Sequence, residues 1–283
     1  MLKILKLFIY PYKLPAYFKE LYSIIKTNYE LINNYETKPS HLQYGQLKKD
    51  RAFDLSISLK NQIKNFKKYN DVKENFYVVE IGTFLGESLK LIGDICEKNI
   101  ENYTIISIDP YKTFEKVGKK NIGWHIRMSK NIKKTYQIFI NNLSNYTFKK
   151  NVIHIRQTSD EAFLLLQSLN LKIDFCYIDG SHLYKNIKSD YVNFSNLIRK
   201  NKKYSGLISG DDYEYTFEEL LTLSEKKENE LLSILKDLEN VDYTILDTSN
   251  KRKFGFHPGI TLFFKEMDYK IIKFKSGFWI NEN

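Results

Sequence analysis

The stretch 174–213, DFCYIDGSHLYKNIKSDYVNFSNLIRKNKKYSGLISGDDY, decides the fold class of this 283-residue chain. DFCYIDGS and YSGLISGDDY each contain a short apolar run, and the segment between them has the apolar spacing of a helix. A strand, a helix and a second strand predict two parallel neighbours in one sheet. Asp179 ends the first run, and Asp211 with Asp212 ends the second. Either these are three solvated loop carboxylates, or two strands bring them to one place.

The same alternation continues on both sides of this stretch. Further strands are predicted within FYVVEIG (76–82), YTIISIDPY (103–111) and NVIHI (151–155). A charged helix is predicted over 216–240, followed by two closing strands in VDYTILDT (241–248) and GITLFFKE (259–266). Ser159 or Asp160 is placed to cap the helix after NVIHI. The pattern predicts an α/β fold with a mostly parallel sheet, helices on both faces and an antiparallel strand at one edge.

Residues 1–70 are predicted to be a helical extension that precedes a domain at 71–283. LPAYFKELYSIIKTNYELINNY (14–35) and LSISLKNQIKNFKKY (55–69) both have apolar residues at helical spacing. The first residues, MLKILKLFIYPYK, are too short an apolar run to span a membrane. This amphipathic segment is expected to lie on a membrane surface, on the domain or on a second subunit, and the last choice would give a homodimer.

The composition favours a globular protein with an excess of positive charge. Lys and Arg number 44 against 34 Asp and Glu, a formal charge of +10. Such a balance suits anionic partners, but the basic residues are scattered and general compositional bias is an alternative explanation. No arginine-rich arm or zinc-finger spacing is present, so no nucleic-acid partner is expected. Cys96 and Cys176 lie in apolar patterns, which suits a reducing compartment such as the cytoplasm, with or without membrane association.

A second group of polar and glycine residues follows the strand predicted at 76–82. Glu80, Gly82 and Gly86 form ExGxxxG between that strand and the next helix. Glycines there let the backbone approach a ligand closely, and the carboxylate can accept hydrogen bonds. The pattern is neither GxGxxG nor a Walker loop, and a structural turn is the alternative. Asp109, at the end of the next strand, is placed to accept both hydroxyls of a ribose.

These motifs together resemble class I S-adenosylmethionine-dependent methyltransferases. The similarity is to the branch of macrocin-type sugar O-methyltransferases and cephalosporin hydroxylase-like proteins, and it covers roughly residues 75–215. The matching segments are VVEIGTFLGES, ISIDPY, YQIFINNL, IRQTSDEA, YIDGSHLY and LISGDDY. The resemblance implies a Rossmann-like sheet and transfer of a methyl group from S-adenosylmethionine to a hydroxyl of a sugar or glycan precursor.

The resemblance also implies roles for single residues. The methionine and ribose part of the cofactor would contact the first motif: Glu80, Gly82, Thr83, Gly86 and Ser88. Asp109 would hold the ribose, and Ser159 with Asp160 would lie near the adenine. Asp179, Asp211 and Asp212 would bind Mg²⁺ or another divalent cation, which prefers oxygen ligands.

Histidines are the candidate bases of the expected reaction. His182, shortly after Asp179, is the candidate general base for the acceptor hydroxyl, and a helix-terminal hydrogen bond is its alternative role. His257 could reach the pocket too, but a turn with Pro258 and Gly259 is the favoured interpretation. His125, Trp124 and Arg127 lie in an irregular segment that could act as a lid.

Two departures from the family pattern concern the acceptor side. NKKYSG replaces the usual turn before the last metal strand, and the helix that follows Glu214, Glu218 and Glu219 is long. The acceptor is therefore expected to be a small molecule or glycan, anionic if the basic charge is selective. Two alternatives remain: a hydroxylase-like metal enzyme on the same fold, and a non-catalytic accessory subunit that retains the nucleotide pocket.

Overall fold

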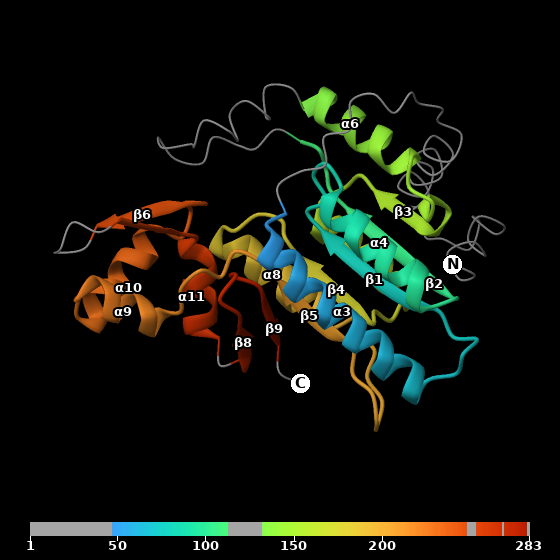
Figure 1. The fold of residues 1–283 in the computed structure, drawn as a ribbon. Coiled ribbons are helices and arrows are strands. Elements are labelled where there is room, and N and C mark those ends of the chain that lie inside the picture. Colours follow the sequence, from blue (N-terminus) through green and yellow to red (C-terminus); the bar gives the residue numbers. More distant parts are fainter. Residues whose placement is uncertain (1–46, 113–131, 248–252, 268, 282–283) are drawn as a thin grey trace.

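The computed structural model describes residues 47–112, 132–247, 253–267 and 269–281 (Figure 1). Within these ranges a seven-stranded sheet has the order β3-β2-β1-β4-β5-β9-β8. Its strands are β1 (Phe76–Ile81), β2 (Tyr103–Ile108), β3 (Val152–Ile155), β4 (Phe175–Ile178), β5 (Leu207–Gly210), β8 (Ile271–Lys273) and β9 (Trp279–Asn281). The first five pair in parallel, whereas β9 runs antiparallel to both β5 and β8. The predicted α/β class with an antiparallel addition is confirmed.

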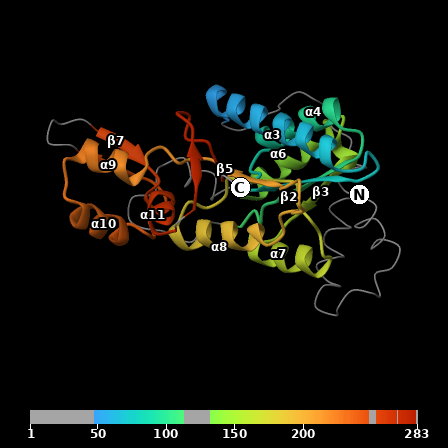
Figure 2. The same ribbon diagram turned by 90° about the horizontal axis from the view of Figure 1, so that it is seen from below.

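Helices cover both faces of the sheet, as Figure 2 shows. One face carries α3 (Lys49–Tyr69), α4 (Glu87–Asn99) and α6 (Ile132–Ser144). The other carries α7 (Ser159–Ser168), α8 (Tyr184–Ser195) and α11 (Pro258–Glu266). The central strand β1 is buried throughout and sends alternate side chains to each face, with Val78 in one core and Val79 in the other. A strand that is buried on both faces reads as a nearly continuous apolar run, and FYVVEI is apolar apart from Glu80.

A smaller unit lies beside the β8–β9 edge (Figure 1). It contains α9 (Phe217–Ser224), α10 (Glu228–Asp237) and the hairpin of β6 (Thr244–Asp247) and β7 (Lys253–Phe256). These elements share a core that includes Phe217, Leu231 and Phe256, to which Leu262 of α11 also contributes. The chain between β5 and α11 therefore builds a separate packed unit next to the carboxyl ends of the strands.

Three predictions about elements were wrong. GITLFFKE forms α11 rather than a strand, because Pro258 begins a helix that is buried along residues 258–264, where apolar side chains leave no period of two. The antiparallel strands of the main sheet come instead from residues 271–281. The segment 216–240 forms two helices, since Glu225 adopts a left-handed conformation (φ 56°) that ends α9. Thr158, not Ser159 or Asp160, caps α7.

The helix predicted at 55–69 is confirmed as part of α3. Its residues Leu55, Leu59, Ile63 and Phe66 are buried in the same core as β1 and α4, so its apolar face covers the sheet. The amphipathic segment at the start of the chain and the helix predicted at 14–35 lie outside the described residues, as do His125, Trp124 and Arg127. Among the described helices, none is long and apolar enough to cross a bilayer.

Candidate active site

The residues that the sequence placed at strand ends meet along one edge of the sheet. The backbone ladder continues one residue past the strands, with Asp179 N donating to Ile81 O (2.8 Å) and Asp211 N to Ile178 O (3.2 Å). Gly82 (φ +89°) packs against the backbone of Asp179, and a Cβ at residue 82 would lie 1.9 Å from the Asp179 carbonyl oxygen. The β1 loop and the β4 loop are therefore in direct contact, and this contact requires glycine.

Glu80 is the most buried carboxylate of the β1 half of this edge. It is 0% exposed, and no described residue makes a hydrogen bond of normal geometry to either of its oxygens. Burial raises the pKa of Glu80 to about 8, while the nearby hydroxyls of Ser88 and Thr83 oppose the shift. A buried carboxyl with free acceptor capacity is suited to a ligand that brings amino or hydroxyl donors.

The other residues of the first motif shape the loop around Glu80. Thr83 is buried and its hydroxyl lies 2.7 Å from that of Ser107. Gly86 (φ +87°) precedes the first residue of α4, and Ser88 is buried in its first turn. Asp109 accepts hydrogen bonds from the backbone N–H groups of Phe84 (2.9 Å) and Tyr111 (2.8 Å), which fixes it beside the loop.

Ser159 and Asp160 lie at the start of α7, on the side that faces α8. Asp160 is exposed and accepts hydrogen bonds from Ser189 (2.6 Å) and Asn193 (3.0 Å) of α8. Ser159 neighbours the buried Asp190, whose pKa is raised to about 7 by burial and held back by the Ser159 hydroxyl. In this arrangement both side chains tie α7 to α8, and their contact with an adenine stays a prediction.

The three aspartates expected to bind a metal do converge in the β4–β5 half. The Tyr177 hydroxyl bridges two of them, 3.5 Å from Asp179 Oδ2 and 3.3 Å from Asp211 Oδ2. Asp212 follows directly and adopts φ 60°, a left-handed conformation that is uncommon for aspartate. Strained backbone of this kind is typical of functional sites, where the surrounding contacts hold it.

A cation of the protein already lies at these aspartates. Arg51 of α3 is 7% exposed; its Nη1 lies 3.0 Å from Asp211 Oδ2 and also contacts Asp212 Oδ1. Its Nη2 lies 3.4 Å from Glu214 Oε1. The carboxylate oxygens suit Mg²⁺ by type, but the guanidinium occupies the position between Asp211 and Asp212 that a shared metal ion would take. Asp211 and Asp212, with Arg51 between them, are therefore not arranged to bind a magnesium ion.

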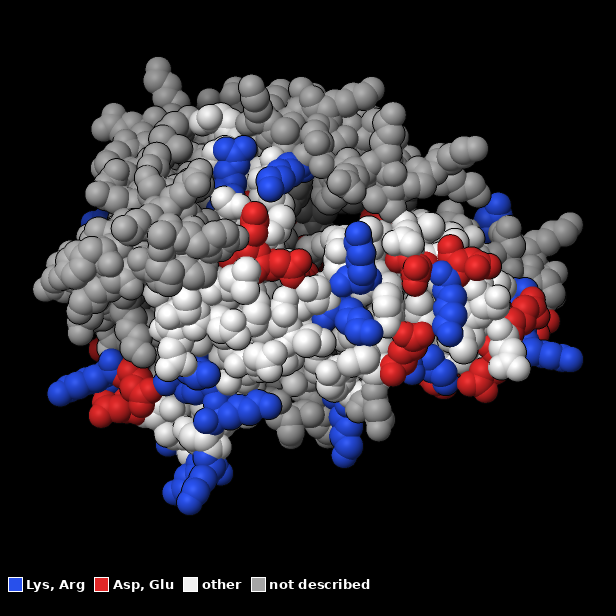
Figure 3. Space-filling model, turned by 180° about the vertical axis from the view of Figure 1, so that it is seen from behind, with Lys and Arg blue, Asp and Glu red and all other residues white. Residues whose placement is uncertain are grey.

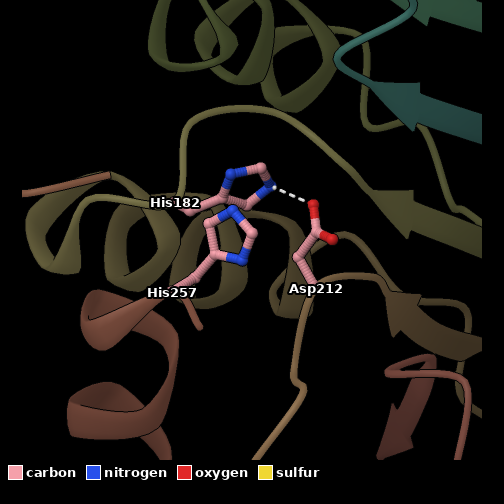
Figure 4. Close-up of side chains that lie close together, drawn as sticks. All are labelled: His182, Asp212 and His257. Carbon is pink, nitrogen blue, oxygen red and sulfur yellow. Dashed lines mark ion pairs between the residues drawn. The ribbon is translucent and has the colours of Figure 1, made fainter. Parts of the chain in front are cut away.

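His182 lies two residues before α8 and points toward Asp212 (Figure 4). Its Nε2 is 3.2 Å from Asp212 Oδ2 and 3.8 Å from Asp179 Oδ1, and its Nδ1 is 3.3 Å from Asp242 Oδ1. Burial opposes the charged imidazole, but Asp212, Asp179 and Asp242 outweigh it and raise the pKa of His182 well above 6.5. These carboxylates therefore favour the charged form of the imidazole over the neutral form.

His257 reaches the same cluster, which was the less favoured of its two interpretations. It precedes α11, its Nδ1 lies 3.1 Å from both carboxylate oxygens of Glu214, and its ring centroid is 4.4 Å from that of His182. In the described part of the chain, His182, Asp212 and His257 form a group whose ligand atoms lie within 4.8 Å of one another (Figure 4). The ion pair between His182 and Asp212 joins two of its members.

The positive charges around Asp212 give its carboxyl group a lower pKa than that of the neighbouring Asp211. Burial would raise the pKa of Asp212, but His182, His257 and Arg51 outweigh this and lower the pKa to about 2. For Asp211, burial and the negative charges of Asp212 and Asp179 raise the pKa well above 3.8. Asp212 is thus the ionised member of the pair, and Asp211 is the one that retains a proton most readily.

Three residues of this half were not predicted from the sequence: Arg51, Tyr177 and Asp242. The sequence did contain a signal for Tyr177, because it lies two residues before Asp179 along the same extended backbone and so projects to the same face. Arg51 and Asp242 are separated from the aspartates by 160 and 30 positions, counted from residue 51 to 211 and from 212 to 242, and no local pattern marks them.

The surface charge is mixed on the face that Figure 3 shows. Lys and Arg of the described residues stand among Asp and Glu there, with no extended region of one sign. This agrees with the scattered basic residues of the sequence.

Comparisons with known proteins point to one family. Residues 79–213 match the family model described as a methyltransferase domain. The chain is 35% identical, over 147 residues, to an uncharacterized protein of Acanthamoeba polyphaga mimivirus. That match covers 50% of this chain, and the chain spans only 53% of the relative.

Two solved structures are similar at low identity. One is TDP-rhamnose 3'-O-methyltransferase of calicheamicin biosynthesis (13% identity, TM-score 0.38, 86% of this chain and 95% of that one). The other is the O-methyltransferase NovP (12% identity, TM-score 0.41, 81% and 87%). Such TM-scores add nothing to the fold that the strand order itself shows. The family match begins within β1 and ends just past β5, the segment in which most of the candidate residues lie, so this part of the chain is similar to methyltransferase domains.

Proposed function

We propose that the chain methylates a hydroxyl group of a sugar or glycan precursor. The observation that carries the proposal is the packing of the Gly82 loop on the Asp179 backbone, since it brings Glu80 and His182 to the same edge. S-adenosylmethionine fits the β1 half by chemistry: the buried Glu80 has acceptor capacity for its amino or hydroxyl donors. The acceptor hydroxyl would then lie on the side of His182.

In the proposed reaction the acceptor oxygen attacks the sulfonium methyl group. An O–CH₃ bond forms, the S–CH₃ bond breaks, and S-adenosylhomocysteine leaves as a neutral thioether. The proton of the hydroxyl passes to Nε2 of His182, and Asp179 and Asp212 stabilise the imidazolium that results. Because the surrounding carboxylates raise the pKa of His182, the neutral base becomes more abundant as the pH rises, so the reaction should be favoured by alkaline conditions.

The choice of a sugar hydroxyl follows the resemblance of DGSHxY and GDDY to sugar O-methyltransferases. Metal assistance by Asp179, Asp211 and Asp212 is part of that resemblance, but Arg51 lies at two of these residues, so the reaction above uses no metal ion. The positive net charge supports an anionic acceptor such as a nucleotide sugar or a lipid-linked sugar phosphate.

The test is methyl transfer from labelled S-adenosylmethionine to a panel of nucleotide sugars, lipid-linked sugar phosphates and neutral glycosides. A general base contributes roughly 10²–10⁴-fold, so His182→Gln should lose activity by that factor while it still binds the cofactor. Glu101→Gln, on the exposed surface after α4, is the matched control and should retain activity. Equal turnover by the wild type and His182→Gln would show that the histidine is not the base. Methylation of neutral glycosides alone would show that the acceptor is not anionic.

A second function is favoured by one observation. Two imidazoles and one carboxylate, as in His182, His257 and Asp212, are the ligand set of non-haem Fe(II) oxygenases. The alternative is hydroxylation of the acceptor, in which these residues would hold Fe(II) to activate dioxygen and a 2-oxo acid co-substrate would supply the two further electrons, in keeping with the hydroxylase-like relatives of the branch. Methyl transfer under strict anaerobiosis without iron supports the first function. Product formation that requires Fe(II), dioxygen and a 2-oxo acid, but no S-adenosylmethionine, supports the second.

We also propose that the protein works in the cytoplasm, near a membrane surface that it contacts through residues 1–30. The support is the amphipathic, lysine-containing sequence of that segment. Flotation with vesicles that contain anionic lipid should carry the full chain but not a chain that begins at residue 31. The same two proteins, compared by light scattering, test whether this segment forms a homodimer instead.

A further inference from the structure

Arg51 places a permanent positive charge at the centre of the aspartate cluster. Its guanidinium uses both terminal nitrogens on carboxylates, Asp211 with Asp212 through Nη1 and Glu214 through Nη2. Nε donates to the carbonyl oxygen of Ser276 at 2.9 Å. A guanidinium stays charged in proteins, and its planar fork matches carboxylates. The buried charge therefore faces three carboxylates.

All four carboxylate oxygens of Asp211 and Asp212 have partners within the protein. Asp211 Oδ1 accepts from the backbone N–H of Asp212 at 2.7 Å, and Asp211 Oδ2 faces Tyr177 and Arg51. Asp212 Oδ1 faces Arg51, and Asp212 Oδ2 lies 3.2 Å from His182 Nε2. A divalent cation bound by both aspartates would have to break at least one contact of each residue.

A helix, not a loop, holds the guanidinium in this place. Leu55 and Leu59, one and two turns beyond Arg51 in α3, are 0% exposed. The Ser276 hydroxyl donates to Asp54 Oδ2 of the same helix at 2.5 Å. Gly277 (φ +91°) turns the chain there, and a Cβ at residue 277 would lie 3.4 Å from Arg51 Nη2. The turn and the helix together form the socket of the guanidinium.

We propose that Arg51 takes the place of a divalent cation at Asp211 and Asp212. The tethered charge neutralises the pair and orients Asp212 toward His182, so Arg51 is a positioning residue. Mg²⁺ binds oxygen at about 2.1 Å, so an ion on these oxygens would lie close to a like charge, and the two cations exclude each other. The link to catalysis rests on the proposed methyl transfer, whereas the exclusion of a divalent ion does not.

The experiment is a titration with Mn²⁺, an oxygen-binding divalent ion whose free form is counted by electron paramagnetic resonance. Four proteins are compared: wild type, Asp211→Asn, Arg51→Met, and the double variant Arg51→Met with Asp211→Asn. The wild type should show no Mn²⁺ site that depends on Asp211. Arg51→Met should gain one site per chain, and the double variant should lose it again. A merely structural arginine would lower stability on removal but would create no ion site.

Two results overturn the proposal. One is a stoichiometric Mn²⁺ site in the wild type that disappears in Asp211→Asn. The other is a folded Arg51→Met protein that gains no site. If Arg51→Met does not fold, the wild type and Asp211→Asn decide alone, and Arg51→Lys, which keeps the charge, should also bind no Mn²⁺. Titration of S-adenosylmethionine into the same samples reports the proposed function separately. If S-adenosylmethionine does not bind, the proposed methyl transfer is wrong, but the Mn²⁺ titration still tests the role of Arg51.

Discussion

The two halves of the carboxyl edge treat buried negative charge in opposite ways. In the β1 half, Glu80 has no ion pair with a described cation, and burial raises its pKa to about 8. In the β4–β5 half, the Asp212 side chain is 16% exposed, and His182, His257 and Arg51 bring its pKa to about 2. The first half depends on a ligand to compensate the carboxylate, whereas the second half provides its own cations. An uncompensated carboxylate suits a site that binds a cofactor with many hydrogen-bond donors, whereas a carboxylate paired with cations suits a site for proton transfer.

The largest effect is expected where the two halves touch. Gly82→Ala would place a Cβ 1.9 Å from the Asp179 carbonyl oxygen in a left-handed backbone, and should destabilise the fold by roughly 3–5 kcal/mol. Gly86→Ala is the control, since it has the same φ sign but its nearest contact is Phe139 at 3.4 Å, and about 1–2 kcal/mol is expected. Urea unfolding measures both. Equal losses would mean that backbone conformation, not the contact between the halves, sets the requirement for glycine.

Glu80→Gln should weaken cofactor binding and stabilise the protein at once. Hydrogen bonds to a charged group contribute about 1.5–3 kcal/mol, so the affinity for S-adenosylmethionine should fall roughly 10- to 100-fold. The folded-state pKa, about 8, lies above the ordinary 4.5, so the wild type loses stability as pH rises between these values. The amide avoids this loss, which is on the order of 3 kcal/mol.

The measurement for Glu80 is thermal and urea unfolding at pH 5 and pH 8, beside calorimetric titration of the cofactor. The variant should gain on the wild type only at the higher pH. Asp160→Asn, an exposed carboxylate at the start of α7, is the control for the pH dependence and should follow the wild type. If Glu80→Gln has the same pH dependence of stability as the wild type, a group other than Glu80 causes that dependence.

The sequence predicted the β1 half better than the β4–β5 half, for a physical reason. Strand, glycine loop and helix are adjacent along the chain, so Glu80, Gly82 and Asp109 could be placed by local pattern and strand ends alone. The β4–β5 half depends on α3, on the smaller unit and on the turn at Gly277, which only tertiary packing brings together. Its three aspartates were predictable from strand ends, but their cations were not.

The wrong helix and strand assignments have a related cause. Segment 259–266 is surrounded by apolar neighbours, so its composition satisfies the expectation for a strand and for a buried helix equally. The break at Glu225 within 216–240 is a single residue in a left-handed conformation, and glutamate gives no local signal for it. The five parallel strands, by contrast, were predicted correctly because they are buried and alternate regularly with helices.

The charge balance of the second half should appear as a pH dependence that follows His182. Asp179, Asp212 and Asp242 face this imidazole, and His257 lies against its ring. Its pKa is raised, so the stability it contributes is fully present below about 6.5 and is lost as pH rises through the folded-state pKa. Methyl transfer should rise over the same range, because the neutral imidazole is the base.

Asp242→Asn sharpens this prediction, since it removes the carboxylate at His182 Nδ1 and leaves Asp212 in place. The rising limb of the pH–rate profile should move to lower pH, and roughly 0.5–1 kcal/mol of stability should be lost near neutral pH. Proton resonance titration of the histidine follows the pKa directly. A limb that stays in place, while the resonance of His182 moves, would assign the base to another group.

The smallest expected effect is the loss of a helix cap, which is compared in α7 and in α9. α7 and α9 begin with the same capping box, Thr158 with Glu161 and Thr216 with Glu219. Loss of such a cap costs about 1 kcal/mol. α7 packs on the main core, so Thr158→Ala should lower global stability, whereas α9 belongs to the smaller core beside β6 and β7, so Thr216→Ala should mainly increase local opening. Hydrogen exchange with urea unfolding distinguishes the two. If Thr216→Ala lowers global stability as much as Thr158→Ala, the smaller unit unfolds together with the sheet, and the second half is then as rigidly held as the first.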